Sequence, residues 1–540
     1  MLPEEGWYDF MILVQNALLY DGSGAAPVRG DVLFDGQIRE IGKITPQPGM
    51  EVMDAKGKVL CPGFIDIHRH PDIAALCDDD FGEIELSQGI TATIAGNCGM
   101  APVPCTAVFR KQQYDYIEPC LGRFAPDIRP NTHEEYLALL EKRGLPLNMG
   151  LLIGAGAVKA AVRGYGPGGF SQAELTRALG LVAEAMDLGA FGLSMGIMYL
   201  PECYSSFDEL NALAKAAGSK GGILTVHIRG EGDTLAPSVR EVLSVAETAE
   251  IPLHISHFKA TGIRNWRDKI FDAIELIEKA QSRGQKVTVD VYPYEAGSTT
   301  LTSLLPPAVQ KETLTETLRY LSGTGGREQL RKEIYRKQDS WENVALSIGW
   351  ERVMICSVSA AENAELIGKS LAQAALLRHY GEPADFLCDL LVQESGKVTV
   401  LLSSMSPRDV ETVLRLTYAA VISDALYGDK KHAHPRLYSA FPKVLETYVK
   451  KQSVLSLQEA IRKMTAFPAE IMGMRGYGML KEGYAADLVL FDLEQVKTQA
   501  TYEKPAQLSS GMDYVFVGGK AAWKNERPVP EKSGRIIKKQ

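Results

Sequence analysis

The chain has 540 residues, of which 45% are hydrophobic and 23% charged, and its formal net charge is −9. This is the composition of an ordinary globular protein long enough for two or more domains. The acidic balance argues against nucleic acid as the main partner, because phosphate binding requires a basic surface. Residues 1–6 lack the features of a secretion signal, and no apolar run reaches the length of a membrane span. We therefore expect a cytoplasmic protein without nucleic-acid or membrane partners.

Both ends of the chain predict short β-strands. Residues 9–14 and 31–38 form apolar runs between Gly- and Asp-rich turns, and residues 486–492 and 514–520 have the same character. Because these segments flank one central block, we expect a small β-sandwich domain formed by residues 1–61 and 476–540. Two unrelated hairpins are the alternative. We expect the tail, residues 535–540, to be a solvated end.

The central block, residues 62–475, alternates apolar strand-like runs with amphipathic helical patterns, which is typical of βαβ units around a parallel sheet. The candidate strands end near residues 67, 95, 153, 195, 227, 257, 291 and 423. Eight such units predict a (β/α)8 barrel of the TIM type. The gap of about 302–415 after the seventh strand is too long for one crossover, so we expect a lid-like insertion there.

Metal-binding side chains are found where several of these strands end. His68 and His70 follow the first strand two positions apart, so both imidazoles can point to one face and converge on a metal ion. Ligands at the carboxyl ends of several strands are what a metal-dependent barrel enzyme needs. The candidates that follow other predicted strands are Cys98, His227, His257 and Asp424.

These candidates have structural alternatives. A lone cysteine is more often a small core residue, but the Gly-Asn-Cys-Gly setting of Cys98 favours a ligand. His254 competes with His257; we favour His257 because it lies at the end of its strand, whereas His254 lies within it as a core histidine. Asp424 has the alternative of a helix cap or a surface aspartate. The other seven cysteines are scattered without paired spacing, so we expect buried thiols rather than disulfides.

Several motifs carry a family resemblance. Residues 62–70 and 483–489 resemble the amidohydrolase superfamily. Within it, the chain resembles the N-acyl-D-amino-acid deacylases at residues 96–99, 256–259, 290–299 and 434–437. The resemblance covers most of the chain and implies zinc-dependent hydrolysis of an N-acyl-D-amino acid to a carboxylate and a free D-amino acid. In this group a cysteine thiolate replaces the carboxylated lysine that bridges two metals in many relatives.

Ligand chemistry agrees with this resemblance, because zinc accepts thiolate, imidazole and carboxylate and a catalytic site keeps one position open. The tight zinc site is expected to consist of Cys98, His227 and His257. A second, weaker site that shares the thiolate is expected to consist of His68, His70 and Asp424. The resemblance implies that only the tight site has to be filled for activity.

The remaining site residues handle protons and substrate. Asp424 is expected to take a proton from zinc-activated water and to return one to the leaving amine. The resemblance implies that the α-carboxylate of the substrate is bound by Lys259, Tyr292, Ser298 and Arg436. The two cations have the alternative of solvated surface charges, and Tyr292 that of barrel packing. Arg229 and Glu231 are expected to pair, either beside the site or on the surface.

The sequence is also compatible with three other functions. A cyclic amidase such as a hydantoinase or dihydropyrimidinase, or an enzyme that cleaves D-amino-acid-containing dipeptides, would use the same fold. Cys98 stands where hydantoinase-like enzymes are expected to have a lysine, which counts against the cyclic amidase. A non-catalytic barrel would usually have lost metal ligands, and every expected ligand is present. Residues 299–307 are apolar and hydroxylic, which favours hydrophobic over acidic D-amino acids.

Overall fold

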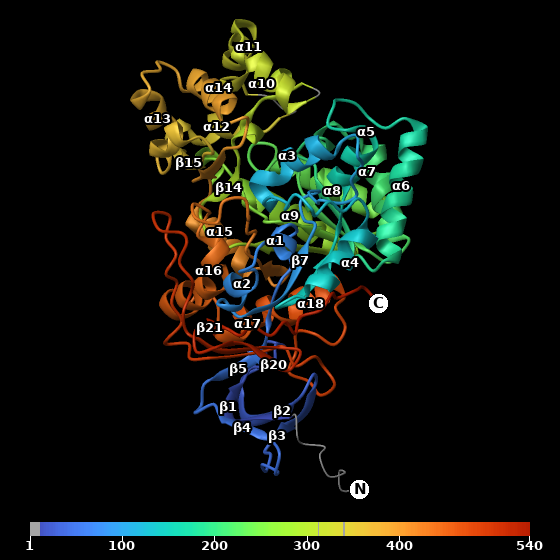
Figure 1. Cartoon of the computed structure of the whole chain (residues 1–540), viewed down its shortest axis with the longest axis vertical. Helices are drawn as coiled ribbons and strands as arrows, with labels where there is room; N and C mark the ends of the chain where they lie inside the picture. Colours follow the sequence, from blue (N-terminus) through green and yellow to red (C-terminus); the bar gives the residue numbers. More distant parts are fainter. Residues whose placement is uncertain (1–10, 312, 338–340) are drawn as a thin grey trace.

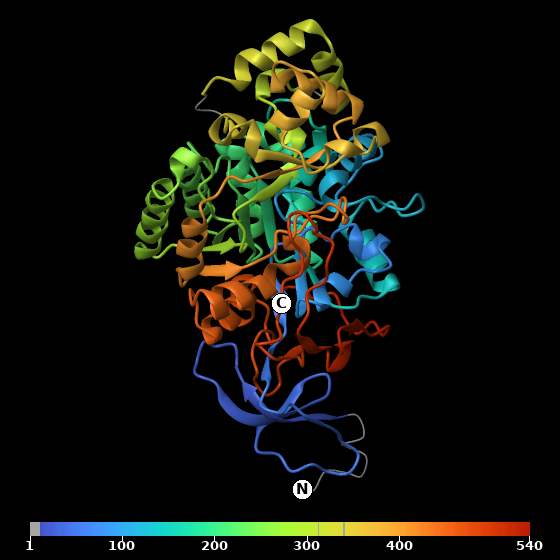
Figure 2. The same ribbon diagram turned by 90° about the vertical axis from the view of Figure 1, so that its left-hand side faces the viewer.

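The computed structural model describes residues 11–311, 313–337 and 341–540, so the first two residues of the expected strand at 9–14 lie outside it. Three parts follow one another along the longest axis (Figures 1 and 2). The N-terminal strands lie at one end, a barrel lies in the middle, and the insertion covers the other end. None of the helices in the described ranges is long and apolar enough to cross a membrane.

Eight parallel strand segments form the barrel, and the third is divided into β8 and β9. Hydrogen bonds from Leu152 N to Ala95 O and from Phe191 N to Leu151 O join this third segment to its neighbours. A parallel bridge between Arg69 and Ala425 joins the first segment to the last. The barrel strands are β6 (Phe64–Asp66), β7 (Ile90–Ala95), β8 (Asn148–Leu151), β9 (Ile153–Gly154), β10 (Gly192–Gly196), β11 (Ile223–His227), β12 (Leu253–Ile255), β13 (Val287–Val291) and β17 (Ala419–Val421).

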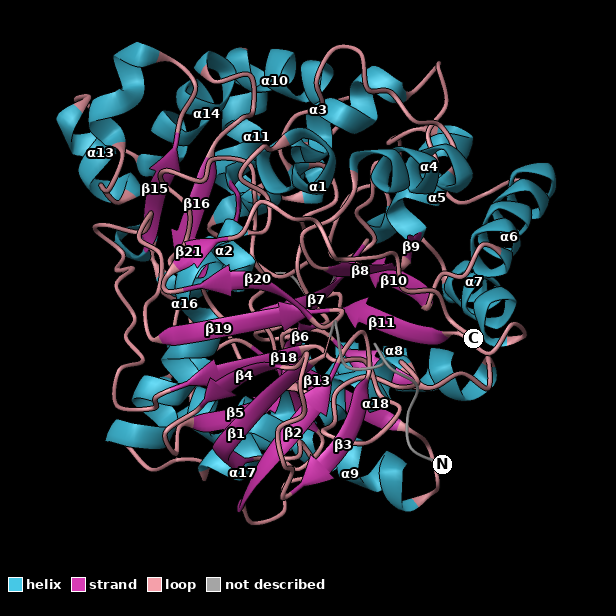
Figure 3. Ribbon diagram, turned by 60° about the horizontal axis from the view of Figure 1, so that its bottom comes forward, coloured by secondary structure: helices cyan, strands magenta, loops and turns pink. Residues whose placement is uncertain are grey.

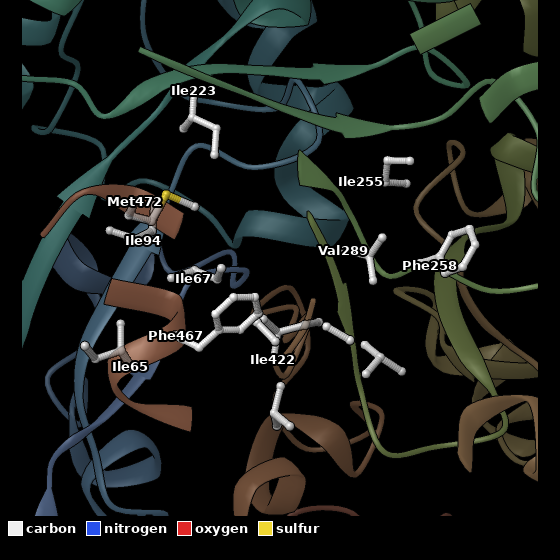
Figure 4. Close-up of a cluster of buried hydrophobic side chains, with 14 of the residues drawn as sticks. Ile65, Ile67, Ile94, Ile223, Ile255, Phe258, Val289, Ile422, Phe467 and Met472 are labelled. Atoms are coloured by element: carbon white, nitrogen blue, oxygen red, sulfur yellow. The ribbon is translucent and has the colours of Figure 1, made fainter. Parts of the chain in front are cut away.

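Helices connect the barrel strands, and three more helices follow the last of these strands. Ser171 and Ser206 begin α6 and α7, and each accepts a hydrogen bond from the backbone of a glutamate three positions on, which fixes where the helix starts. These helices are α1 (Ala74–Cys77), α2 (Glu83–Leu86), α3 (Arg110–Leu121), α4 (His133–Arg143), α5 (Ala155–Arg163), α6 (Gln172–Asp187), α7 (Phe207–Gly218), α8 (Leu235–Thr248), α9 (Lys269–Ser282), α15 (Pro407–Arg415), α16 (Arg436–Lys443), α17 (Leu457–Met464) and α18 (Ala466–Met472). Figure 4 shows buried residues of the core, where Ile94 of β7 lies beside Met472 of α18 and Ile67 lies close to Phe467 of the same helix.

Strands from both ends of the chain form one nine-stranded sheet (Figure 3). Phe34 and Phe516 lie four strands apart in this sheet, yet their ring centroids are 5.1 Å apart, so the sheet folds back over its own apolar face. Its strands are β1 (Ile12–Leu19), β2 (Val28–Phe34), β3 (Ile38–Gly42), β4 (Glu51–Asp54), β5 (Val59–Pro62), β18 (Leu488–Phe491), β19 (Met512–Val517), β20 (Lys520–Lys524) and β21 (Arg527–Pro528).

The C-terminal tail is attached to the barrel, and the prediction of a solvated end is wrong. Ile537 is buried and donates its backbone N–H to Met149 O at 2.8 Å, while Lys539 N donates to Gly189 O at 3.0 Å. The backbone explains the difference: the tail runs beside β8 and satisfies main-chain groups there, which its charged composition does not reveal.

The insertion between β13 and β17 has its own sheet, in the order β14-β16-β15, and its own hydrophobic core. Its elements are β14 (Gly297–Thr300), α10 (Leu314–Ser322), α11 (Thr324–Ile334), α12 (Val344–Ile348), β15 (Val353–Ser357), α13 (Leu371–Leu377), α14 (Pro383–Gln393) and β16 (Thr399–Leu402). Helix α15 packs against the barrel strands β13 and β17 instead. The edges of this unit therefore differ from the expected 302–415, because β14 precedes them and α15 completes the last crossover of the barrel.

Candidate metal centre

The structure brings the predicted ligands together at the carboxyl ends of the barrel strands. Two groups of three side chains have ligand atoms within 4.8 Å of one another, and Cys98 belongs to both. The first group consists of Cys98, His227 and His257, and the second of His68, His70 and Cys98. All five side chains are buried. The thiolate thus lies between two potential metal positions.

The first group has the dimensions of a zinc site. Cys98 Sγ is 3.8 Å from His227 Nδ1 and 3.6 Å from His257 Nε2. A tetrahedral zinc ion with ordinary Zn–S and Zn–N bonds would hold sulfur and nitrogen about 3.6 Å apart. Burial raises the pKa of the Cys98 thiol, but the charge of His68 and hydrogen bonds from the surrounding imidazoles hold this pKa well below its usual value. The thiolate form that a metal requires is therefore favoured.

The Gly-Asn-Cys-Gly loop has a clear structural basis. A side chain at Gly96 would lie 2.3 Å from Leu152 O, and one at Gly99 would meet the carboxylate of Glu202. Both glycines also have positive φ. Asn97 Nδ2 donates to Ile94 O at 2.9 Å, and at longer range to the carbonyls of residues 67 and 69, which ties the loop to the end of β6. Asn97 had no assigned role at the level of sequence.

Backbone strain marks three of the predicted ligands. Cys98, His257 and Asp424 have φ values of +55°, +35° and +51°, in the left-handed region that side chains other than glycine rarely adopt. Each of them follows a barrel strand directly or within a few residues. Such conformations persist at functional sites because the surrounding structure enforces them.

Asp424 lies between the second group and a cation. Its Oδ1 is 3.5 Å from Nε2 of both His68 and His70, and its Oδ2 is 2.8 Å from Nη1 of Arg436. Burial raises the pKa of Asp424, but the charge of Arg436 and a bond from His70 hold this pKa well below its usual range. Asp424 is therefore ionised and lies beside the histidines of the second group.

A buried carboxylate that sequence analysis did not single out orients these histidines. Asp290 Oδ2 is 3.3 Å from His68 Nδ1 and 2.9 Å from His254 Nε2, and its Oδ1 accepts the backbone N–H of His257. His254 Nδ1 also bonds to Thr288 Oγ1 at 2.8 Å, so both of its ring nitrogens are engaged, as the preference for His257 requires. Because Asp290 accepts from Nδ1 of His68, it leaves Nε2 of that ring to face Cys98 at 3.2 Å.

Asp290→Asn is expected to weaken metal binding at the second position by about 10–100-fold, the usual cost of losing a partner behind a ligand. The asparagine NH2 would donate toward His68 Nδ1 and favour the wrong tautomer. Zinc titration of the purified variant measures this affinity. Asp487→Asn is the control, because Asp487 is also buried but binds Asn148 and Gly518 at the other end of the barrel. Equal zinc affinities in the two variants would contradict the orienting role.

The four predicted substrate contacts line the same cavity as the ligands. Lys259 and Arg436 both lie over the ring of Tyr292, with their charged groups 5.6 and 4.7 Å from the ring centroid. Arg436 Nη2 also approaches Ser298 O at 3.5 Å. Both cations already have acidic partners, since Lys259 Nζ is 2.6 Å from Glu231 and Arg436 is paired with Asp424. A substrate carboxylate would have to share these cations.

The expected pairing of Arg229 with Glu231 is wrong. The guanidinium of Arg229 binds Glu241, with its Nη2 2.9 Å from Oε1, whereas Glu231 binds Lys259 and lies 3.0 Å from His257 Nδ1. The reason is the path of the chain: after β11 it turns so that position 231 faces the metal ligands and position 229 faces α8. Glu231 thus orients His257 from the side opposite the thiolate.

Comparison with known proteins agrees with this geometry. Residues 51–289 and 420–525 match the amidohydrolase family Amidohydro_3. The chain belongs to the amidohydrolase family. It is similar to an N-acyl-D-aspartate deacylase from Alcaligenes xylosoxydans xylosoxydans, with 30% identity over 97% of this chain and 94% of the relative.

Solved amidohydrolase structures share the fold over almost the whole chain. An N-acyl-D-glutamate deacylase from Bordetella bronchiseptica, in complex with zinc and a phosphonate inhibitor that mimics the tetrahedral intermediate, has a TM-score of 0.81. It is 25% identical, and the match covers 98% of this chain and 99% of that one. A D-aminoacylase with a binuclear metal centre, described by one-metal activation and second-metal attenuation, has a TM-score of 0.81 and 26% identity, with 98% and 100% coverage. The predicted barrel fold and family are thereby confirmed.

Proposed function

We propose that this amidohydrolase uses zinc to hydrolyse N-acyl-D-amino acids to a carboxylate and a free D-amino acid. One observation carries the proposal. A buried thiolate with two imidazoles at zinc-like spacing opens on a cavity that also contains two cations, Lys259 and Arg436. The names of two relatives specify N-acyl-D-amino acids as their substrates, which supports the same substrate class here.

The expected roles of the two metal sites follow from the chemistry of the side chains that form them. The tight zinc site would consist of Cys98, His227 and His257, and the weaker site of His68, His70, Asp424 and the shared thiolate. When bound, zinc would polarise the scissile carbonyl of the substrate. It would also lower the pKa of water, so that hydroxide is available as the nucleophile near neutral pH. Asp424 holds a carboxylate beside the histidines of the second group, where it can accept a proton from the attacking water and donate it to the leaving amine.

Recognition of the α-carboxylate is assigned to Lys259, Tyr292, Ser298 and Arg436. The planar guanidinium of Arg436 suits a carboxylate, and its Nε has no hydrogen-bond partner among the described residues. Both cations lie over the ring of Tyr292, and its hydroxyl lies 3.8 Å from Met405 Sδ, a weak contact that a substrate oxygen would outcompete. These groups would hold the substrate so that its amide faces the metal ligands.

Stereochemistry gives the sharpest test of this function. The D-enantiomers of N-acetylalanine and N-acetylleucine should be hydrolysed with kcat/KM at least about 100-fold above their L-enantiomers, because an inverted α-carbon must lose either the charge-assisted bonds or its side-chain position. Steady-state kinetics of the zinc-loaded protein on both enantiomers measures the ratio. A ratio near one, or activity confined to hydantoins and cyclic imides, would reject the deacylase function in favour of a cyclic amidase.

We also propose where the enzyme acts and what kind of partner it has. We place it in the cytoplasm, acting on a small molecule without nucleic acid or a membrane as partner. The net charge of −9 supports this, as do the eight cysteines, all within the described ranges and all free.

We further propose that residues 1–61 with 476–540 form one domain and residues 62–475 the catalytic barrel, with the insertion acting as a lid over the cavity.

A further inference from the structure

A second, larger cavity adjoins the metal cavity. Its volume is about 260 Å³, against about 70 Å³ for the cavity at the ligands. Met198, Tyr199 and Glu342 line both. The ring of Tyr199 lies 4.6 Å from the ring of His227, measured between centroids. A group attached to a substrate at the metal would therefore reach the second cavity directly past Tyr199.

Aromatic and aliphatic side chains dominate the wall of the second cavity, and they come from two parts of the fold. Loops of the barrel and α3 supply four tyrosines, including Tyr199, whereas the insertion supplies aliphatic groups and an indole ring. The residues that matter most here are Tyr116, Tyr165, Tyr204, Leu305, Leu314 and Trp341. The insertion is held against the barrel by Glu342, which accepts hydrogen bonds from the backbone of residues 232–234.

The cations of this lining are already engaged. Arg229 forms a bidentate ion pair with Glu241, and its Nη1 donates a hydrogen bond to Cys203 O at 3.0 Å. The Lys311 ammonium lies 3.9 Å above the ring centroid of Tyr320. Within the described part of the lining, these are the two cationic side chains. Glu241 offsets the charge of Arg229, and Glu342 adds a carboxylate to the same wall. A second carboxylate on the substrate would therefore lose its water for contact with a mostly apolar wall in which Lys311 is the cation paired with a ring and not with a carboxylate.

We propose that the second cavity binds a bulky apolar substituent of the N-acyl-D-amino acid, carried on either the D side chain or the acyl group. The inference rests on the proposed deacylase function and names its substrate class. An apolar cavity of about 150 Å³ is enough to admit benzene, so this larger one has room for an aromatic ring and a short linker. The substrate class thus differs from the D-aspartate and D-glutamate compounds named for two relatives.

Substrate comparison tests the proposal. N-acetyl-D-alanine serves as the small reference, N-acetyl-D-phenylalanine and N-acetyl-D-tryptophan test the side chain, and N-phenylacetyl-D-alanine tests the acyl group. At least one of the bulky substrates should have a kcat/KM at least tenfold above that of N-acetyl-D-alanine. The kcat/KM of N-acetyl-D-glutamate should be lower than that of every apolar substrate. The substrate that is cleaved better identifies which substituent, the side chain or the acyl group, enters the cavity.

Two results would overturn the inference in distinguishable ways. If N-acetyl-D-alanine is cleaved but no bulky substrate is better, or if N-acetyl-D-glutamate is best, the cavity assignment fails and the deacylase function stands. If no N-acyl-D-amino acid is cleaved by the zinc-loaded protein, the proposed function fails and the inference fails with it.

Variants at Leu314 locate the effect in the cavity. Leu314→Trp fills the wall and should lower the ratio of bulky to small kcat/KM at least tenfold. Thr315→Trp is the matched control, because the neighbouring side chain on α10 is exposed, and it should leave the ratio unchanged. Leu314→Lys tests the charge argument separately, since an added cation should raise the ratio of D-glutamate to D-phenylalanine substrate at least tenfold. Unchanged ratios in both Leu314 variants would overturn the proposal.

Discussion

Cys98→Ala is expected to lose tightly bound zinc and hydrolytic activity together. The thiolate is the one ligand common to both groups, and its removal leaves two imidazoles at the tight position. Loss of a direct ligand should cost more zinc affinity than the roughly 10–100-fold typical of an outer partner. Elemental analysis of the purified variant, alongside its kcat on N-acetyl-D-alanine, measures both quantities.

A matched cysteine variant separates this effect from damage to the fold. Cys61 is also fully buried but lies in β5 of the terminal sheet. Cys61→Ala should keep its zinc and its activity. A folded Cys98→Ala protein with the zinc content of the parent would show that the metal is held by other side chains.

Asp424→Asn should lower kcat by at least about 10²-fold, the usual contribution of a positioned general base. Asparagine keeps the shape of the side chain but cannot take a proton. The three side chains of the first group are unchanged, so tightly bound zinc should remain. Steady-state kinetics together with zinc content tests both statements.

Asp429→Asn is the control for Asp424→Asn, because Asp429 lies in the same loop but pairs with His432 and not with the metal cluster. It should retain kcat within about twofold, as expected for a partly exposed ion pair. If Asp424→Asn kept the kcat of this control, the proton acceptor would have to be sought elsewhere in the cavity.

Sequence patterns were sufficient to locate the barrel strands and the side chains that gather at their carboxyl ends, and the reason is physical. Parallel barrel strands are buried on both sides, so they appear as short apolar runs, and the functional side chains must follow them at the carboxyl ends. The predicted ends at 95, 227 and 291 coincide with the last residues of β7, β11 and β13. The roles of the individual side chains remain predictions that the variants above address.

The features that sequence analysis missed depend on contacts between distant segments. Asp290 orients histidines from two other strands, and nothing in its own strand indicates this. Glu231 binds Lys259 rather than its near neighbour Arg229, because the direction of each side chain is set by the turn after β11. The second cavity needs both the barrel loops and the insertion, so its apolar wall is not contiguous in the chain.

The terminal sheet also constrains how the protein is made. Strand β5 pairs with β1 on one side and with β18 on the other, although β18 follows it by more than 400 residues in the sequence. During synthesis one edge of β5 therefore stays unpaired until these further residues have left the ribosome, and an open strand edge is a site for pairing with other chains. Such long-range pairing is also slow to form. Nascent chains of this protein thus pass through a prolonged aggregation-prone stage, during which a chaperone that shields the first strands would raise the yield.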